Sequence, residues 1–126
     1  PSEGNLRGPV ILSQLPESSV LRRIEAFGPV VYLEAFDDDA EAIAKINASR
    51  FGLQAGLYSQ HQRRIDRYFR QLQVGALIVD DIPTFRADHM PYGGIKDSGL
   101  GREGLRYTFE EYTEQRLLVL PKFGPQ

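Results

Sequence analysis

Short apolar runs, rich in β-branched and aromatic residues, recur along the first two thirds of the chain. Runs of this length and composition are typical of strands buried in a sheet. The longest is VVYLEAF at residues 30–36. The pattern predicts strands at residues 9–12, 30–36, 54–58 and 75–79.

Two segments between these strands have the period of an amphipathic helix. The first covers residues 38–49, and the acids at its start suit an N-cap and the positive end of a helix dipole. We expect Gly52 to end this helix in the left-handed conformation. The second helix is predicted at residues 60–73, capped by Ser59, with an apolar stripe at Ile65, Tyr68, Phe69 and Leu72.

The order of these elements predicts the fold class. Residues 30–80 run strand, helix, strand, helix, strand. Helices between consecutive strands imply right-handed crossovers and a parallel sheet with helices on both faces. We therefore expect an α/β fold built on a parallel sheet, within a single domain over residues 1–126.

The last third of the chain follows a different pattern. Residues 80–102 show no period, and with Gly104 just beyond them they hold five of the chain's 12 glycines. A loop this long in a compact domain is usually functional. A helix is predicted from Arg102 to Glu114, with Leu105, Phe109 and Tyr112 on one face. A final strand is predicted at residues 116–120, before Pro121.

Composition and charge narrow the possible functions. The net charge of −2 gives no electrostatic reason to expect a nucleic acid or membrane partner, and no apolar run reaches the roughly 20 residues that span a bilayer. The chain has no cysteine, which excludes a thiol nucleophile and fits the reducing cytoplasm, where we expect the protein to act. Because the sequence does not begin with Met, we expect a trimmed or excised piece.

Individual motifs say little about chemistry. GLGREG at residues 99–104 matches a dinucleotide-binding pattern. That motif requires a strand directly before it, and the sequence predicts none there. The two histidines, His61 and His89, lie far apart without patterned acids, so we expect no metal site. The residues by themselves leave the function undetermined.

An ordered series of motifs carries more information. EAFGPV at 25–30, NASRFGL at 47–53, PYGGIKDSGLGREG at 91–104 and EYTE at 111–114 resemble the C-terminal part of NAD(P)-dependent aldehyde dehydrogenases. Within that superfamily, IPTFRADHMPYGG at 82–94 resembles branches that act on lactaldehyde or phosphonoacetaldehyde. The resemblance implies a segment of the catalytic domain that ends in an oligomerisation strand.

The resemblance also implies binding residues. Glu25 would bind the hydroxyls of the nicotinamide ribose of NAD or NADP, and Phe27 would pack against the nicotinamide. The alternative is a surface acid and a core aromatic. Phe85, Arg86 and His89 would line the path of the aldehyde substrate, with Arg86 recognising an anionic group. The alternative for Arg86 is a pair with Asp81 or Asp88.

The family's catalytic cysteine and general-base glutamate, like its Rossmann domain, belong to the part upstream of EAFGPV. The resemblance therefore places no catalytic residue in this chain, and we expect it to neither oxidise aldehydes nor bind cofactor by itself. We expect it to form a homo-oligomer. An alternative remains, in which a truncated gene product acts as a non-catalytic oligomerisation or binding module. Asp80 stands where the family often has Asn, which leaves the role of that amide open.

Overall fold

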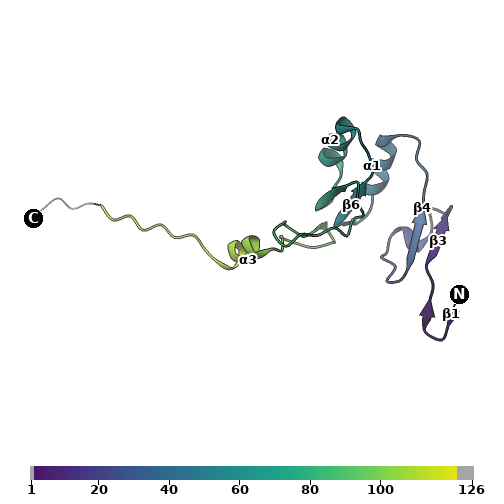
Figure 1. Cartoon of the computed structure of the whole chain (residues 1–126), viewed down its shortest axis with the longest axis horizontal. Coiled ribbons are helices and arrows are strands. Elements are labelled where there is room, and N and C mark those ends of the chain that lie inside the picture. Colours follow the sequence, from purple (N-terminus) through teal and green to yellow (C-terminus); the bar gives the residue numbers. More distant parts are fainter. Residues whose placement is uncertain (1, 122–126) are drawn as a thin grey trace, which may run out of the picture.

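The computed structural model describes residues 2–121, which form short helices and strands along an elongated molecule (Figure 1). The elements are β1 (Ser2–Glu3), β2 (Leu6–Arg7), β3 (Val10–Ser13), the 3-10 helix η1 (Val20–Arg22), β4 (Val30–Leu33), α1 (Asp39–Asn47), β5 (Phe51–Gly52), β6 (Gln54–Leu57), α2 (Gln62–Gln71), β7 (Ala76–Val79), β8 (Ile95–Lys96) and α3 (Leu105–Tyr112).

The strands pair two by two. β3 is parallel to β4, and β6 is parallel to β7 with α2 as the crossover between them. β1–β2 and β5–β8 are short antiparallel pairs. The α/β class and the parallel pairing are thus confirmed. One continuous sheet through residues 30–80 is not formed, because β4 pairs with β3 and not with β6 among the described residues.

The start of α1 agrees with the sequence pattern. Asp38 is its N-cap, and the carboxylate accepts hydrogen bonds from the backbone N–H of Ala40 at 2.8 Å and of Glu41 at 2.9 Å. The prediction for Gly52 is wrong, since this residue lies in β5 and its φ is not positive. A Cβ there would lie 2.6 Å from the carbonyl oxygen of Gln73, so close approach of two backbones explains this glycine.

The buried core of the described chain is small. It consists of Ala42, Ile43 and Tyr68, with Leu57, Leu72 and Leu77 packed against it. Within the predicted stripe of α2, Tyr68 is buried but Phe69 is 72% exposed, so the stripe is narrower than expected. All four residues of β4 are exposed, and the expected cover of helices on both faces is absent there.

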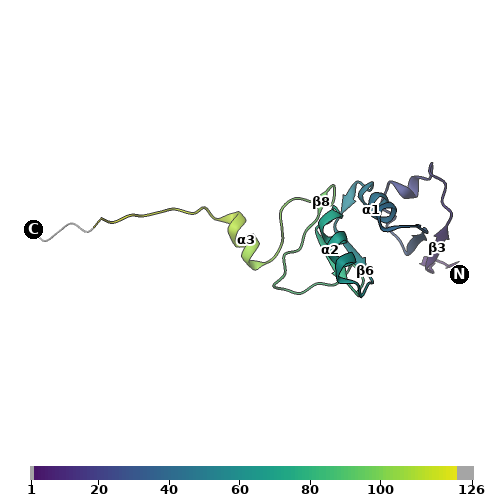
Figure 2. The same cartoon turned by 90° about the horizontal axis from the view of Figure 1, so that it is seen from above.

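The C-terminal part extends away from the rest of the molecule. α3 begins at Leu105, and residues 113–121 form an extended arm without helix or strand (Figures 1 and 2). The strand predicted at residues 116–120 is therefore not formed within this chain, because no described strand lies beside it. The apolar side chains of α3 and the arm are exposed: Leu105, Phe109, Tyr112, Leu117, Leu118, Val119 and Leu120.

Candidate functional site

A groove of about 810 Å³ separates β4 from the β5–β6 region. One side is formed by alternate residues along and after β4, which are Tyr32, Glu34 and Phe36. A second side is formed by residues of α1 and just after it, at helical spacing. Consecutive residues around the start of β6 also line the groove, which therefore reaches an edge of that strand. These lining residues are Ala42, Lys45, Ile46, Ser49, Leu53, Gln54 and Ala55.

The segment that joins β3 to β4, here called the connecting segment (residues 14–29), carries both predicted cofactor residues. Glu25 is exposed and lines the groove. Its side chain also lines a second cavity of about 350 Å³, together with Leu12, Leu15 and Tyr32. Phe27 is 95% exposed, which rules out a core role for this ring within the described chain.

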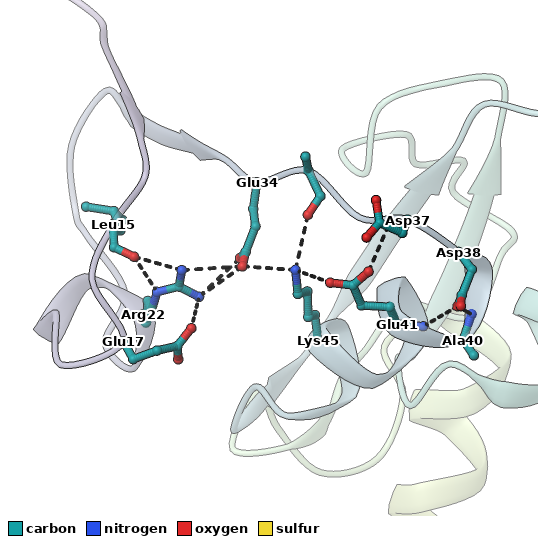
Figure 3. Close-up of polar contacts among 10 residues, drawn as sticks. Leu15, Glu17, Arg22, Glu34, Asp37, Asp38, Ala40, Glu41 and Lys45 are labelled. Carbon is teal, nitrogen blue, oxygen red and sulfur yellow. Dashed lines mark hydrogen bonds and ion pairs between the residues drawn. The ribbon is translucent and has the colours of Figure 1, made fainter.

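A row of charged side chains links the connecting segment to α1 (Figure 3). The guanidinium of Arg22 donates to both carboxylate oxygens of Glu34 at 3.1–3.3 Å, and Lys45 Nζ lies 3.1 Å from the same carboxylate. Lys45 also pairs with Glu41 at 2.7 Å and donates to the carbonyl of Ala35 at 3.1 Å. The charges alternate in sign along this row.

These contacts shift the ionisation of the row. The pKa of Glu34 is lowered, mainly by the hydrogen bond from Lys45. Burial acts in the opposite direction, and the charge of Arg22 lowers the pKa further. The backbone N–H of Asp37 and then the ammonium of Lys45 lower the pKa of Glu41. Hydrogen bonds to Glu41 and Glu34 raise the pKa of Lys45. All three groups are therefore charged at neutral pH.

The residues expected along the substrate path lie in a different region. Phe85 is 49% exposed and His89 is exposed. The guanidinium of Arg86 stacks over the ring of Tyr92 at 4.2 Å and donates to Glu103 at 3.3 Å. The expected alternative partners, Asp81 and Asp88, are not the ones that Arg86 contacts.

Arg86 lines a cavity of about 590 Å³ against α3, with Glu103, Leu105, Thr108 and Phe109. This cavity and the groove at Glu25 share no lining residue. The structure thus presents two separate candidate regions, one at the connecting segment and one beside α3.

Asp80, at the end of β7, has a structural role. Its φ of 58° lies in the left-handed region, which Asp and Asn tolerate better than most residues. The Oδ1 atom accepts a hydrogen bond from the N–H of Ser59 at 3.1 Å. An Asn side chain could accept the same bond through its Oδ1, so Asn at this position is also compatible with the local structure.

The glycine-rich loop, residues 91–104, packs against the end of α1. Lys96 Nζ donates to the carbonyls of Asn47 and Ser49, both at 2.9 Å, and Ser98 Oγ accepts from the N–H of Gly52 at 2.9 Å. Asn47 also bridges to the residues after α2, since its amide donates to the carbonyl of Gln71 and accepts from the N–H of Gln73. The NASRFG motif (residues 47–52) and the GGIKDSG motif (residues 93–99) therefore make structural contacts between α1, β5, β8 and the end of α2.

Sequence reasoning missed several of these residues. Arg22 and Glu34 carry no local sequence signal for their contact, whereas Glu41 and Lys45 have the i, i+4 spacing of a helical ion pair. Over residues 2–121, no group of three potential ligands could hold a metal ion. No helix in that range is long and apolar enough to cross a membrane.

Comparison with known proteins gives a consistent result. The model of the family described as "Aldehyde dehydrogenase family" matches residues 1–118. The chain is 45% identical over 112 residues to 3-sulfolactaldehyde dehydrogenase of Priestia megaterium, which covers 89% of this chain and 24% of that protein. It is 42% identical over 118 residues to sulfoacetaldehyde dehydrogenase of Neptuniibacter caesariensis, which covers 94% and 26%.

A solved structure agrees as well. Aldehyde dehydrogenase 21 from Physcomitrella patens, in complex with the reaction product succinate, superposes with a TM-score of 0.91 at 34% identity. The match covers 100% of this chain and 26% of the other. The chain spans about a quarter of the length of the relatives that it matches.

Proposed function

We propose that this chain, which belongs to the aldehyde dehydrogenase family, is the C-terminal part of an NAD(P)-dependent aldehyde dehydrogenase and supplies cofactor contacts to the whole enzyme. Glu25 and Phe27 would make those contacts. The observation that carries the proposal is their placement, with an exposed carboxylate on the wall of a large groove and an almost fully exposed ring two residues further on.

The chemistry of these two side chains suits a nicotinamide cofactor. A carboxylate accepts hydrogen bonds from two neighbouring ribose hydroxyls at once. An aromatic ring holds a flat heterocycle by stacking and by excluding water. When bound, NAD(P) supplies a hydride acceptor for aldehyde oxidation. Pro29 fixes its own φ directly before β4 and limits the freedom of the segment that carries both residues.

The surface of the described chain supports its being part of a larger domain. β4 and β6 each have one partner strand, and the groove lies between these two pairs. The stripe at residues 42, 45 and 46 of α1, continued by Ser49 after the helix, faces this groove. A strand from the rest of the longer protein, laid between β4 and β6, would satisfy both open edges and cover the helix stripe.

Arg86 points to the class of substrate. The relatives named above act on 3-sulfolactaldehyde and sulfoacetaldehyde, and the Physcomitrella patens enzyme holds succinate, all of which carry an anionic group. A guanidinium stacked on Tyr92 presents its donors in a fixed plane. The pair with Glu103 is exposed and thus weak, so an anionic substrate could replace it. Phe85 and His89 would line the same path.

The experiment uses the full-length enzyme that contains this segment. We expect Glu25→Gln to raise the Kd for NAD(P)H about tenfold or more, since hydrogen bonds to a charged acceptor contribute roughly 1.5–3 kcal/mol. Fluorescence titration measures this constant. The control is Asp37→Asn, which removes an exposed acid whose side chain makes no hydrogen bond or ion pair among the described residues. Equal affinities in both variants would refute the cofactor role.

The second candidate is a stand-alone oligomerisation or binding module. The exposed apolar side chains of α3 and the arm favour it. Both proposals predict a purified chain that forms oligomers in light scattering and oxidises no aldehyde, because it contains no cysteine. They differ in the encoding gene. An open reading frame that continues upstream into a cysteine-containing segment supports the enzyme, and its absence supports the module.

A further inference from the structure

We propose that Arg22 is a positioning residue for Glu25, which holds the connecting segment so that the Glu25 carboxylate faces the groove. This inference rests on the proposed function, because the consequence to be measured is cofactor affinity. Arg22 would touch neither the cofactor nor the substrate.

The contacts of Arg22 join three parts of the chain. Its guanidinium donates to the carbonyl of Leu15 at 2.8 and 3.2 Å, near the start of the connecting segment. It also donates to both carboxylate oxygens of Glu34, just after β4, and lies over the ring of Tyr32 at 5.8 Å. The Arg22 side chain is only 19% exposed, so these contacts are shielded more than those of a surface pair.

The connecting segment has few other anchors. Its remaining backbone hydrogen bonds are local, apart from the carbonyl of Pro29, which accepts from Val10 at 2.8 Å. Among the described residues, the bonds from Arg22 to Glu34 are the polar side-chain contacts that tie this segment to the rest of the fold. Figure 3 shows that Glu34 is in turn held by Lys45 of α1.

The residues that Arg22 contacts also form the walls around Glu25. Leu15 and Tyr32 line the smaller cavity with Glu25, and Tyr32 and Glu34 line the groove with it. Glu25 follows Arg22 by three residues. When Arg22 is lost, the segment can rotate about its two ends, and the carboxylate leaves the position that a ribose requires.

The test compares Arg22→Ala with Arg23→Ala in the full-length enzyme. Arg23 is the adjacent arginine, is exposed, and makes no side-chain hydrogen bond or ion pair among the described residues. Both variants remove one positive charge. We expect the Kd for NAD(P)H to rise about tenfold in Arg22→Ala and less than about twofold in Arg23→Ala. Arg22→Lys should lie between, because lysine keeps the charge but loses the planar fork.

Two further measurements separate positioning from general stability. In Arg22→Ala the KM for NAD(P) should rise about tenfold, with kcat and the KM for the aldehyde changed less than about twofold. A lower Tm with unchanged cofactor affinity would overturn the proposal. If Glu25→Gln weakens cofactor binding and Arg22→Ala does not, the positioning role alone fails. If neither weakens binding, the proposed cofactor site fails with it.

Discussion

The hydroxyl of Tyr68 on α2 donates a hydrogen bond to Oδ1 of Asp39 at the start of α1, at 3.1 Å. Tyr68 is the most buried of the three core residues at 4% exposure, and its only polar side-chain atom is satisfied by this contact. Burial, and then the neighbouring carboxylate, raise the pKa of Tyr68. The pair joins α2 directly to the start of α1.

Replacing Tyr68 by Phe should therefore lower the free energy of unfolding by about 1 kcal/mol, because the ring stays buried while the hydrogen bond is lost. Denaturant titration of the full-length protein measures the change. Tyr58→Phe is the control, since Tyr58 is 68% exposed and its hydroxyl makes no hydrogen bond among the described residues. Equal effects of the two substitutions would contradict the role of the Tyr68–Asp39 contact.

The charged row from Arg22 to Glu41 should weaken in acid. The folded state lowers the pKa of Glu34 and Glu41, so their contribution to stability is complete above the ordinary value of 4.5 and is lost as the pH falls below it. Lys45 has a raised pKa, so its contribution is lost only in strong alkali. The difference in Tm between the wild type and Glu34→Gln should thus shrink as the pH drops from about 4.5 toward about 3. A difference in Tm that stays constant over this range would contradict a stabilising role for the charged Glu34 carboxylate.

Gly75 should tolerate no larger residue. A Cβ at this position would lie 1.8 Å from the carbonyl oxygen of Gly93 and 2.8 Å from that of Leu53, so the glycine-rich loop would have to move. We expect Gly75→Ala to cost about 3 kcal/mol or more in the free energy of unfolding. Gly28→Ala is the matched control, because a Cβ there meets nothing within 4 Å and should change stability by less than about 0.5 kcal/mol.

Arg86→Ala should change substrate preference. We expect kcat/KM to fall about tenfold or more for an anionic aldehyde such as succinate semialdehyde, and less than about twofold for a neutral aldehyde of similar size. The control is Arg63→Ala, an exposed arginine of α2 without a side-chain partner among the described residues. An equal fall in kcat/KM for both aldehydes would refute the recognition role. Arg86 would then have only its structural contacts with Tyr92 and Glu103.

Much of the local structure follows from the sequence because it depends on neighbouring residues. The Asp38 cap bonds N–H groups two and three positions away, and α1, α2 and β7 lie within the segments that the periodicity predicts. Gly52 shows the limit of this reasoning. Its position after a helix suggested a left-handed end, whereas contact with the backbone of Gln73 decides its conformation.

The candidate site likewise depends partly on the sequence and partly on the tertiary structure. The motif order by itself determined the family and selected Glu25, Phe27 and Arg86 for attention. Only the tertiary structure decided that Arg86 pairs with Glu103, that Arg22 reaches Glu34, and that Lys96 binds the end of α1. Partners separated by 12 to 49 positions meet through chain folding, and no local pattern specifies which charges will then lie together.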